Sequence, residues 1–300
     1  MSKVLVVGSI NMDLVAQVGH YPRLGETLLG SGFATYHGGK GANQAVAAAR
    51  LGAQVSMIGR VGADAFGQQL TAGLIAEGID ARWVQTSTGM ASGIAMITLA
   101  GSDNAIIVVP GANAMLSPAD ILAAEAAFID TDVVIAQLET PLPTIYQVAE
   151  LAQRHGKPFI LNPAPAMALP AELLAQVSLL TPNEFELGMA LQIPESEWRS
   201  ALQQRLGKVL MTAGQDGAWY CDENGQLQQQ ASFKVEALDT TGAGDTFNGA
   251  LAAFWDSGLA QASRMACAAA ALSVTQAGAQ GGMPTQAQLL AFLHEQGEAA

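Results

Sequence analysis

Short apolar runs alternate with longer alanine-rich segments along nearly the whole chain. The apolar runs are the size of buried strands and occupy residues 4–8, 55–59, 133–137, 159–162, 177–181 and 208–212. Helical patterns lie between several of them, over residues 43–51, 64–76, 118–128 and 142–155. Because strands that alternate with helices build βαβ units, this pattern predicts an α/β fold with a mainly parallel sheet covered on both faces.

Two regions interrupt this alternation. Residues 14–18 and 27–36 read as extended pieces, and residues 92–99 and 105–109 as a hairpin that turns at Gly101, Ser102 and Asp103. Four extended pieces without helices between them predict a small antiparallel sheet that projects from the main body as a lid, within about residues 14–36 and 92–109. The rest of the pattern contains no repeat or long linker, so residues 1–300 are predicted to form one domain, with a mainly helical end after Gly242.

Composition narrows the class of protein. The apolar runs are too short to span a bilayer, and the first residues lack a signal-peptide pattern, so we expect a cytoplasmic protein without a membrane partner. The two cysteines, Cys221 and Cys267, have no zinc-ligand spacing. With 26 acidic and 13 basic side chains, a net charge of -13 predicts no nucleic-acid partner. A phosphate-bearing ligand would therefore need helix N-termini and glycine-rich loops.

The strongest candidate for such a loop is DTTGAGDTFNG at residues 239–249, which follows an extended stretch at residues 233–238 and leads into an apolar helical pattern. Backbone amides from Gly242, Ala243 and Gly244 suit an anion at a helix start, and Asp245 beside it is placed to accept a proton from a hydroxyl nucleophile. A plain glycine-rich turn, with Asp245 favoured by the helix dipole, explains the same spacing.

A second glycine-rich segment, GGKGANQA at residues 38–45, also enters a helix. It is not a Walker A loop, because Ala34 and Gly41 stand where that motif needs glycine and serine or threonine. Lys40 and Asn43 are positioned to reach a hydroxylated ligand, and a simple helix entry is the alternative.

Polar residues follow several of the predicted strands, where open α/β sheets bind ligands. Asn11 and Asp13 suit vicinal sugar hydroxyls, although this spacing taken alone is more often found in a turn; Glu139 is a further candidate or an exposed loop acid. Asn183 and Glu186 are spaced to organise Mg²⁺ through water or to form a helix-capping box. The glycines between Thr212 and Gly217 admit a nucleotide phosphate or make a turn.

Taken together and in order, these segments resemble the PfkB (ribokinase) family of carbohydrate kinases. The resemblance covers essentially the whole chain and rests on GSINMD, PRLGET, GGKGANQAVAAARLG, VGADAFG, GANAMLSP, QLETP, NPAPA, TPNEFE, DTTGAGDTFNGA and GAQGGMP. It implies a ribokinase-like three-layer α/β/α sandwich with a small β-sheet lid, which commonly serves as a homodimer interface.

The resemblance also implies roles for individual residues. Asp245 is the expected catalytic base, and the amides from Gly242 through Ala243 and Gly244 to Asp245 form the expected anion hole. The expected sugar-binding residues are Asn11, Asp13, Gly39, Lys40, Asn43 and Glu139. The expected nucleotide-binding residues are Asn183, Thr212, Gly214, Gly217 and Gly244.

Two cations are implied in the same way. Mg²⁺ accompanies ATP and is placed with the help of Glu186 through water. A monovalent cation, usually K⁺, is expected near Asp239, Thr241, Ser273, Gln276 and Gly278. Gly282 stands where related kinases often have a serine ligand, which predicts a weaker K⁺ site. Cys267 lies at or near a position that lines adenine and often holds asparagine or histidine, so selectivity for the base is open.

The function implied is phosphorylation of D-ribose at its 5-hydroxyl by ATP. A kinase for 2-deoxyribose or for another pentose or nucleoside is the nearest alternative, because relatives share GGKGANQ and NPAPA. A non-catalytic regulatory protein that binds a sugar or nucleotide is the alternative from another class, although Asp245 and its glycine turn are retained. A nicotinamide-dependent oxidoreductase is disfavoured, since no G-x-G-x-x-G follows the first strand.

Overall fold

The centre of the molecule is a six-stranded parallel sheet with the strand order β10-β9-β8-β1-β4-β5. The computed structural model describes residues 2–101 and 103–297. The six strands are β1 (Lys3–Val7), β4 (Gln54–Gly62), β5 (Asp80–Ser87), β8 (Val133–Ala136), β9 (Phe159–Leu161) and β10 (Leu179–Leu180). The predicted α/β fold with a mainly parallel sheet is therefore confirmed.

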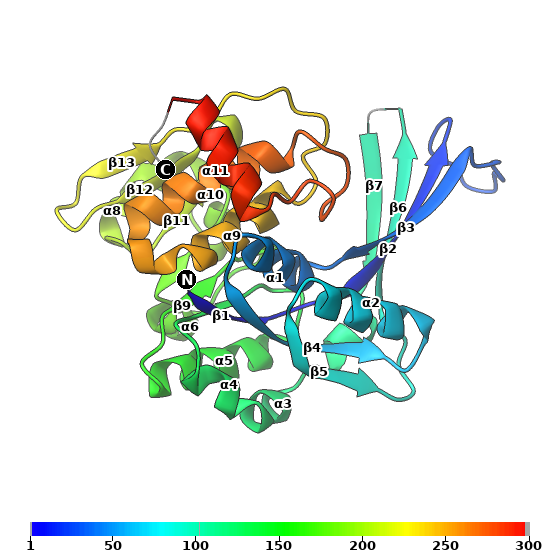
Figure 1. Cartoon of the computed structure of the whole chain (residues 1–300), viewed down its shortest axis with the longest axis horizontal. Coiled ribbons are helices and arrows are strands. Elements are labelled where there is room, and N and C mark those ends of the chain that lie inside the picture. Colours follow the sequence, from blue (N-terminus) through cyan, green and yellow to red (C-terminus); the bar gives the residue numbers. More distant parts are fainter. Residues whose placement is uncertain (1, 102, 298–300) are drawn as a thin grey trace.

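Alternate residues of β1 face two separate cores, which is why its apolar run is continuous. Val4 and Val6 belong to one core, and Leu5 and Val7 to the other. The first core takes side chains from α1 (Lys40–Arg50), α2 (Ala65–Ala76), α9 (Ala243–Ala253), α10 (Leu259–Ser273) and α11 (Gln286–Glu295). The second takes them from α3 (Pro118–Ala123), α4 (Glu125–Ile129), α5 (Leu142–Arg154), α6 (Ala171–Gln176), α7 (Glu184–Leu191) and α8 (Trp198–Gln204). Figure 1 shows the resulting three layers, helices above and below the sheet.

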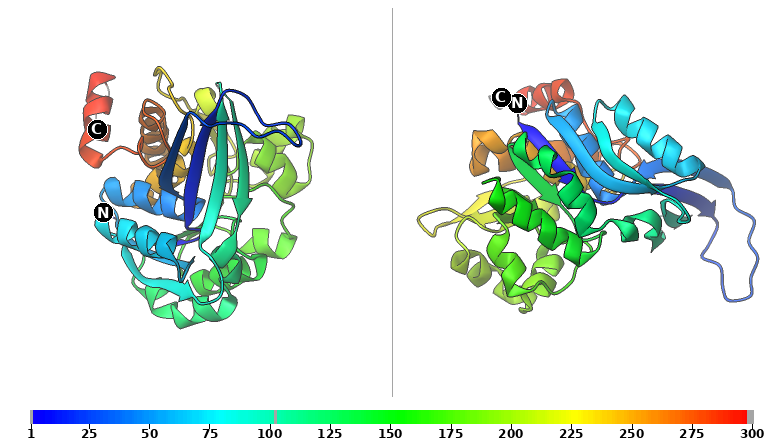
Figure 2. Two further views of the ribbon diagram at one scale, coloured as in Figure 1. Left: turned by 90° about the vertical axis from the view of Figure 1, so that its right-hand side faces the viewer. Right: turned by 90° about the horizontal axis from the view of Figure 1, so that it is seen from below.

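The lid is a second sheet with the strand order β3-β2-β6-β7. Its strands are β2 (Asn11–Val18), β3 (Gly32–Gly38), β6 (Gly93–Ala100) and β7 (Asp103–Val109). The expectation of a purely antiparallel sheet is wrong, because β2 and β6 pair in parallel. Both strands leave the central sheet from the same side, so they run in the same direction, away from the body (Figures 1 and 2). Ser102 of the predicted turn lies outside the described residues.

The run at residues 208–212 was expected in the central sheet, but most of it forms part of a third sheet. Strands β11 (Leu210–Thr212), β12 (Ala218–Cys221) and β13 (Leu227–Gln230) pair there in antiparallel order. Isolated parallel bridges, Leu180 with Val209 and Asn183 with Thr212, continue the central sheet toward β11. Residues 233–238, which were read as extended, contain no strand.

The helix expected at residues 118–128 is divided at Ala124 into α3 and α4. Four short 3₁₀ helices complete the described structure: η1 (Gly111–Met115), η2 (Glu195–Glu197), η3 (Gly214–Asp216) and η4 (Trp255–Ser257). Across the described residues, the helices are either too short or too polar to cross a membrane.

Candidate active site

The two glycine-rich segments meet at Asp245, in the first turn of α9. Its carboxylate is 8% exposed and accepts one amide N–H on each oxygen. Asn43 Nδ2 donates to Oδ2 at 2.9 Å, and Gln44 Nε2 donates to Oδ1 at 3.1 Å. Since both donors lie on α1, the fold joins residues that are about two-thirds of the chain apart in sequence.

The start of α9 has the geometry of an anion-binding turn. Gly242 is its N-cap residue with a φ of 78°, a conformation that favours glycine. The Ala243 amide closes the turn onto the Thr240 carbonyl at 3.2 Å. The amides of Gly244 and Asp245 belong to the first helical turn, whose N–H groups lack acceptors within the helix. These two amides, more than that of Ala243, are placed to receive an anion.

Asn11 and Asp13 lie in the first residues of lid strand β2, and not in a turn after β1 as their spacing suggested. Asn11 pairs with Gly38, and Asp13 with Tyr36, on β3. A Cβ atom on Gly38 would lie 2.4 Å from the Asp13 carboxylate oxygens, so only glycine leaves room for this carboxylate. The sugar-side candidates thus stand at the roots of the lid strands.

Glu139 contacts the beginning of α1. Its Oε2 accepts the Ser9 hydroxyl at 2.5 Å and the Lys40 amide at 3.3 Å. The N-cap residue Gly39 has a φ of 90° and no side chain to accept an amide, so Glu139 supplies the missing acceptor. The alternative reading of Glu139 as an exposed loop acid is therefore wrong.

These side chains form a cluster of opposite charges. Burial, together with the negative charges of Glu139 and Asp245, raises the pKa of Asp13 to about 7. Burial disfavours the charged form of Lys40, but the carboxylates of Asp245, Glu139 and Glu186 outweigh it and raise the pKa of Lys40. Lys40 is therefore the cation that balances the acidic groups of the site.

Asn113, on η1, fixes the junction between the body and the lid. Its Oδ1 accepts the Ile10 amide at 2.9 Å, and its Nδ2 donates to Asn11 Oδ1 at 2.7 Å. A cavity of about 450 Å³ opens beside it and is lined by Asn11, Glu139 and Thr140, with Val108 from the lid. Asn11 is thus oriented by a buried amide while it faces an open space.

A larger cavity of about 910 Å³ lies at the start of α9. Four of the five predicted nucleotide residues line it: Thr212, Gly214, Gly217 and Gly244. Phe233, Phe247 and Val274 provide apolar walls, and Cys267 lies among them. Burial raises the pKa of the Cys267 thiol to about 12, so this side chain is neutral in the cavity wall. The size and the apolar walls suit a nucleotide base.

Asn183 does not line that cavity. Its Oδ1 accepts the Glu186 amide at 2.8 Å, and Glu186 Oε2 accepts the Asn183 amide at 2.9 Å, which completes a capping box at α7. Burial raises the pKa of Glu186, with Asp245 also raising it, against the lowering effects of the Asn183 amide and Lys40. The capping interpretation of this pair is thus present in the structure, and the role with Mg²⁺ stays a prediction.

The residues expected around K⁺ lie on the loop before α9, at the last residue of α10 and on the loop that follows α10. The Asp239 carboxylate accepts the Thr241 amide at 2.9 Å and the Gly278 amide at 2.8 Å. Although burial opposes it, these amides hold the pKa of Asp239 below its usual range. Ser273 and Gly282 are in close approach, because a Cβ atom on Gly282 would lie 2.0 Å from the Ser273 carbonyl oxygen.

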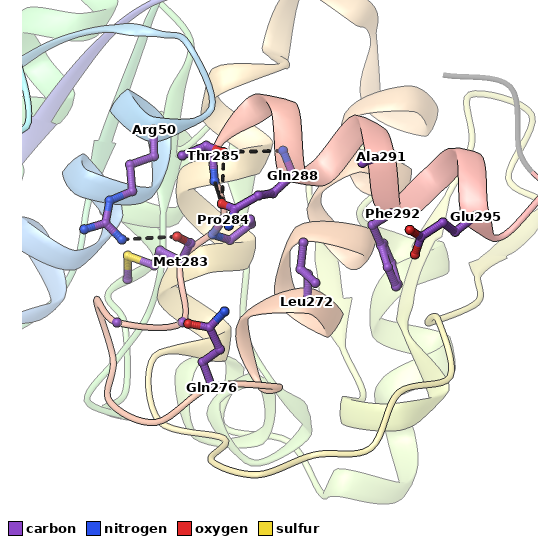
Figure 3. Close-up of a pocket in the computed structure, with 12 residues that line it drawn as sticks. Arg50, Leu272, Gln276, Met283, Pro284, Thr285, Gln288, Ala291, Phe292 and Glu295 are labelled. Atoms are coloured by element: carbon purple, nitrogen blue, oxygen red, sulfur yellow. Dashed lines mark hydrogen bonds between the residues drawn. The ribbon is translucent and has the colours of Figure 1, made fainter.

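Figure 3 shows a cavity of about 380 Å³ next to these loops, lined by Gln276 and Gly282 and by the start of α11. Arg50 pairs with Glu77 and donates to the carbonyls of Gln280 at 2.5 Å and Met283 at 3.1 Å, so it holds the second loop against α1. Within residues 2–101 and 103–297, no group of three His, Cys, Asp or Glu side chains is arranged to hold a metal ion.

Several polar residues that hold the site together were not predicted from the sequence, and all but the half-buried Gln280 are buried. These are Ser9, Gln44, Asn113, Gln137, Asn162, Asn248 and Gln280. Their one local signal is a polar residue directly after, or inside, an apolar run, as for Gln137 after β8 and Asn162 after β9.

Comparisons with known proteins agree with this arrangement. Residues 1–286 match the family described as "pfkB family carbohydrate kinase". The chain is 44% identical to the ribokinase of Bacillus subtilis, with 95% of this chain and 97% of that protein covered. It is 36% identical to the deoxyribokinase of Salmonella typhi, with 97% and 98% covered. The structure of Arabidopsis thaliana ribokinase with ribose and ATP has a TM-score of 0.86, at 31% identity, with 97% and 98% covered.

Proposed function

The chain belongs to the pfkB family of carbohydrate kinases, and on this premise we propose that it transfers the γ-phosphoryl group of ATP to the 5-hydroxyl of D-ribose. One observation carries the proposal: the buried carboxylate of Asp245 stands at an anion-binding helix start, next to the sugar-side cluster and to a cavity of nucleotide size. Residues 1–300 act in this proposal as one kinase domain with a lid.

Asp245 accepts the proton of the sugar hydroxyl as the sugar oxygen bonds to the γ-phosphorus. The bond between that phosphorus and the bridging oxygen breaks, and ADP leaves with the electron pair. The amides at the start of α9, with Gly242 as its cap, stabilise the charge on the transferred group. Asn43, through its bond to Asp245 Oδ2, keeps the carboxylate pointed toward the sugar side.

Sugar recognition falls to the charged cluster at the lid roots. The carboxylates of Asp13 and Glu139 accept hydroxyl protons, while Lys40 and the side chains of Asn11 and Asn43 donate. Gly39 lets the start of α1 approach the β1–β2 junction, because a Cβ atom there would lie 2.7 Å from the Asn11 nitrogen.

The cations fit this site to different degrees. Mg²⁺, bound with ATP, would be held by the phosphates with Glu186 near it through water, and a carboxylate suits that hard cation. It neutralises phosphate charge when bound. K⁺ would be held among Asp239, Thr241, Ser273, Gln276 and Gly278. At Gly282 no side-chain ligand fits, because even a Cβ would clash with the Ser273 carbonyl.

Within the same proposal, two copies of the chain associate through their lids. The lid exposes large apolar side chains, among them Phe33 (70%), Ile107 (64%) and Tyr36 (52%), and such patches mark interfaces. Sedimentation equilibrium should show a dimer that Ile107→Asp weakens. Ile75→Asp is the matched control, because Ile75 is 60% exposed on α2, outside the lid. A monomeric wild-type protein at micromolar concentration would contradict this assembly.

A cytoplasmic location, where ATP is available, stays a prediction.

The test of the function is ADP release with Mg-ATP across a panel of pentoses, hexoses and nucleosides. D-Ribose should give the highest kcat/KM, and ³¹P NMR should place the phosphate on the 5-oxygen. 2-Deoxyribose should be poorer, because polar groups built for a hydroxyl lose their partner when it is absent. A ratio of one or less between ribose and deoxyribose would favour the deoxyribose kinase instead. Sugar binding without any ADP release would favour the regulatory protein.

A further inference from the structure

The Asp245 carboxylate accepts a hydrogen bond from the side-chain amide of Gln44, which is not accessible to substrate. Gln44 is fully buried, with 0% of its surface exposed. Its Nε2 donates to Asp245 Oδ1 and to Asn162 Oδ1, both at 3.1 Å. Its Oε1 accepts the Nε2 of Gln137 at 2.6 Å. Gln44 therefore touches the carboxylate on the oxygen that Asn43 does not contact.

The orientation of the Gln44 amide is determined by these three partners. Both of its N–H groups face oxygen atoms that only accept, and its own oxygen faces an N–H donor. Turning the amide over would place oxygen against the Asp245 carboxylate and nitrogen against the Gln137 nitrogen. The network therefore permits one arrangement, in which Gln44 always donates to Asp245.

The network continues to the anion-binding turn. Asn162 Nδ2 donates to the Thr181 carbonyl at 3.1 Å, Thr181 Oγ1 donates to Asn248 Oδ1 at 2.5 Å, and Asn248 Nδ2 donates to the Gly244 carbonyl at 2.9 Å. The Gly244 carbonyl and the Asp245 amide share one planar peptide group. Fixing that carbonyl therefore also fixes the direction of an amide in the proposed anion hole.

The amide of Gln137 turns its N–H toward Gln44 although this leaves its own oxygen without a hydrogen-bond partner. Its Oε1 is one of two buried side-chain polar atoms without a hydrogen-bond partner among the described residues. Leaving a buried acceptor unpaired is unfavourable, so an apolar residue of the same shape would be tolerated there if only packing mattered. The gain at this position is the donation from Nε2 to Gln44.

From this geometry we infer that Gln44, oriented by Gln137 and Asn162, is a positioning residue for the catalytic carboxylate of Asp245. This inference rests on the proposed function, in which Asp245 is the base. Gln44 keeps one carboxylate oxygen occupied and fixed, which leaves the remaining lone pairs of the carboxylate directed at the sugar hydroxyl. It acts on turnover and not on substrate binding.

The first test is Gln44→Met, which keeps the length of the side chain and removes its donors and acceptor. We expect kcat to fall about 10- to 100-fold, the size of a lost hydrogen bond to a charged group. KM for ribose and for ATP should stay within about threefold, because Gln44 has no exposed surface. Thr144→Val is the matched control: it deletes another fully buried hydrogen bond, from Thr144 to the Leu116 carbonyl, on the opposite face of the sheet. It should lower the melting temperature and leave kcat unchanged.

The second test is Gln44→Glu, which places a carboxyl group against Asp245. Two carboxyl groups at this distance share a proton, so the acidic limb of the pH profile of kcat should move to higher pH by about one unit or more. A limb that stays in place would show that the side chain at position 44 does not contact the Asp245 carboxylate in the active enzyme. Thr144→Val should again give the wild-type profile.

Asp245→Asn, measured in parallel, distinguishes failure of the proposed function, in which Asp245 is the base, from failure of the positioning role of Gln44. If Asp245→Asn keeps its turnover, the proposed base is wrong and the positioning role fails with it. If Asp245→Asn is inactive while Gln44→Met keeps kcat within about twofold, only the positioning role is overturned. An unmoved pH limb in Gln44→Glu also overturns it. Failure of both Gln44 variants to fold counts against it too, because a role in the fold alone would then explain the residue.

Discussion

The pKa of Asp13 predicts how sugar binding depends on pH. Burial, then the charges of Glu139 and Asp245, raise this pKa to about 7. Asp13 is expected to accept sugar hydroxyls as a carboxylate, and that form is present above pH 7 and lost below it. Between pH 8 and pH 6 the ionised fraction falls from about nine-tenths to about one-tenth, so kcat/KM for ribose should drop about tenfold.

The assay is initial-rate ADP release at subsaturating and saturating ribose from pH 5.5 to pH 8.5. The limb in kcat/KM reports the free enzyme and should lie near pH 7; the limb in kcat reports the complex and should lie lower, because bound hydroxyls stabilise the carboxylate. Asp13→Asn should weaken ribose binding and remove the limb near pH 7. Glu139→Gln should move it to lower pH, since one of the charges that raises the pKa is gone.

The free energy of unfolding should fall as the pH rises from 4 to 8, whereas ribose binding should improve over the upper part of this range. The pKa of Asp13 lies about three units above its ordinary value of 3.8, so this group favours the folded state below about pH 4 and loses that contribution as the pH rises through 7. Asp13→Asn should raise the free energy of unfolding at pH 8 by about 2–4 kcal/mol and have little effect at pH 4. A kcat/KM for ribose that is flat between pH 8 and pH 6, or a limb that persists in Asp13→Asn, would refute this reasoning.

Three further changes test other parts of the structure. Asp245→Asn should lower kcat about 100- to 10,000-fold while calorimetry finds nucleotide affinity within a few-fold; near-normal turnover would exclude Asp245 as the base. Gly282→Ser should melt at a lower temperature and gain no affinity for K⁺ in a KCl titration of kcat, because its Cβ meets a backbone carbonyl; tighter K⁺ activation would contradict this. Arg60→Met leaves the buried Asp120 carboxylate without its cation and should cost about 3–5 kcal/mol in urea unfolding, whereas Arg154→Met, which loses exposed ion pairs with Glu125 and Glu150, should cost less than about 1 kcal/mol. Equal losses in both would show that burial is not the cause.

Local pattern was sufficient for five of the six strands of the central sheet and for several of its helices, but it did not predict the edge strand β5. The apolar runs at β1, β4, β8 and β9 and the helical periods after them are short-range signals, and the fold obeys them. Strands β12 and β13 were not predicted because AWYC lacks the Val, Ile and Leu of the other runs and LQQQ is mostly polar; both are defined by antiparallel pairing, β12 with β11 and β13 with β12. The start of β2 was missed because Asn11 and Asp13 are also common in turns.

Some residues of the candidate site could be predicted from the sequence, and others could not. Asp245, Asp13 and Glu139 stand in segments whose composition already indicates chemistry. Gln44 and Asn162 do not, because an amide in an apolar helix or after a strand has many roles and its partner cannot be known in advance. Here the partner of Gln44 is 201 residues away, and the contact is specified by the packing of α1 against α9. Resemblance to a family located these segments, but only the fold shows which atoms meet.

The packing of α9 on α1 also affects the chain while it is being synthesised, because α1 is made long before α9. Ribosomal synthesis adds about 5–20 residues per second, so the α9 surface arrives roughly 10–40 s after α1 has been made. During that interval the face of α1 that later receives Gly249, whose Cβ would lie 2.6 Å from Ala47 Cβ, has no cover. Nascent chains thus carry an apolar helix face that must be protected from aggregation. A chain that ends before α9 lacks both the proposed base and the proposed anion-binding turn, so it could not consume ATP by the proposed mechanism.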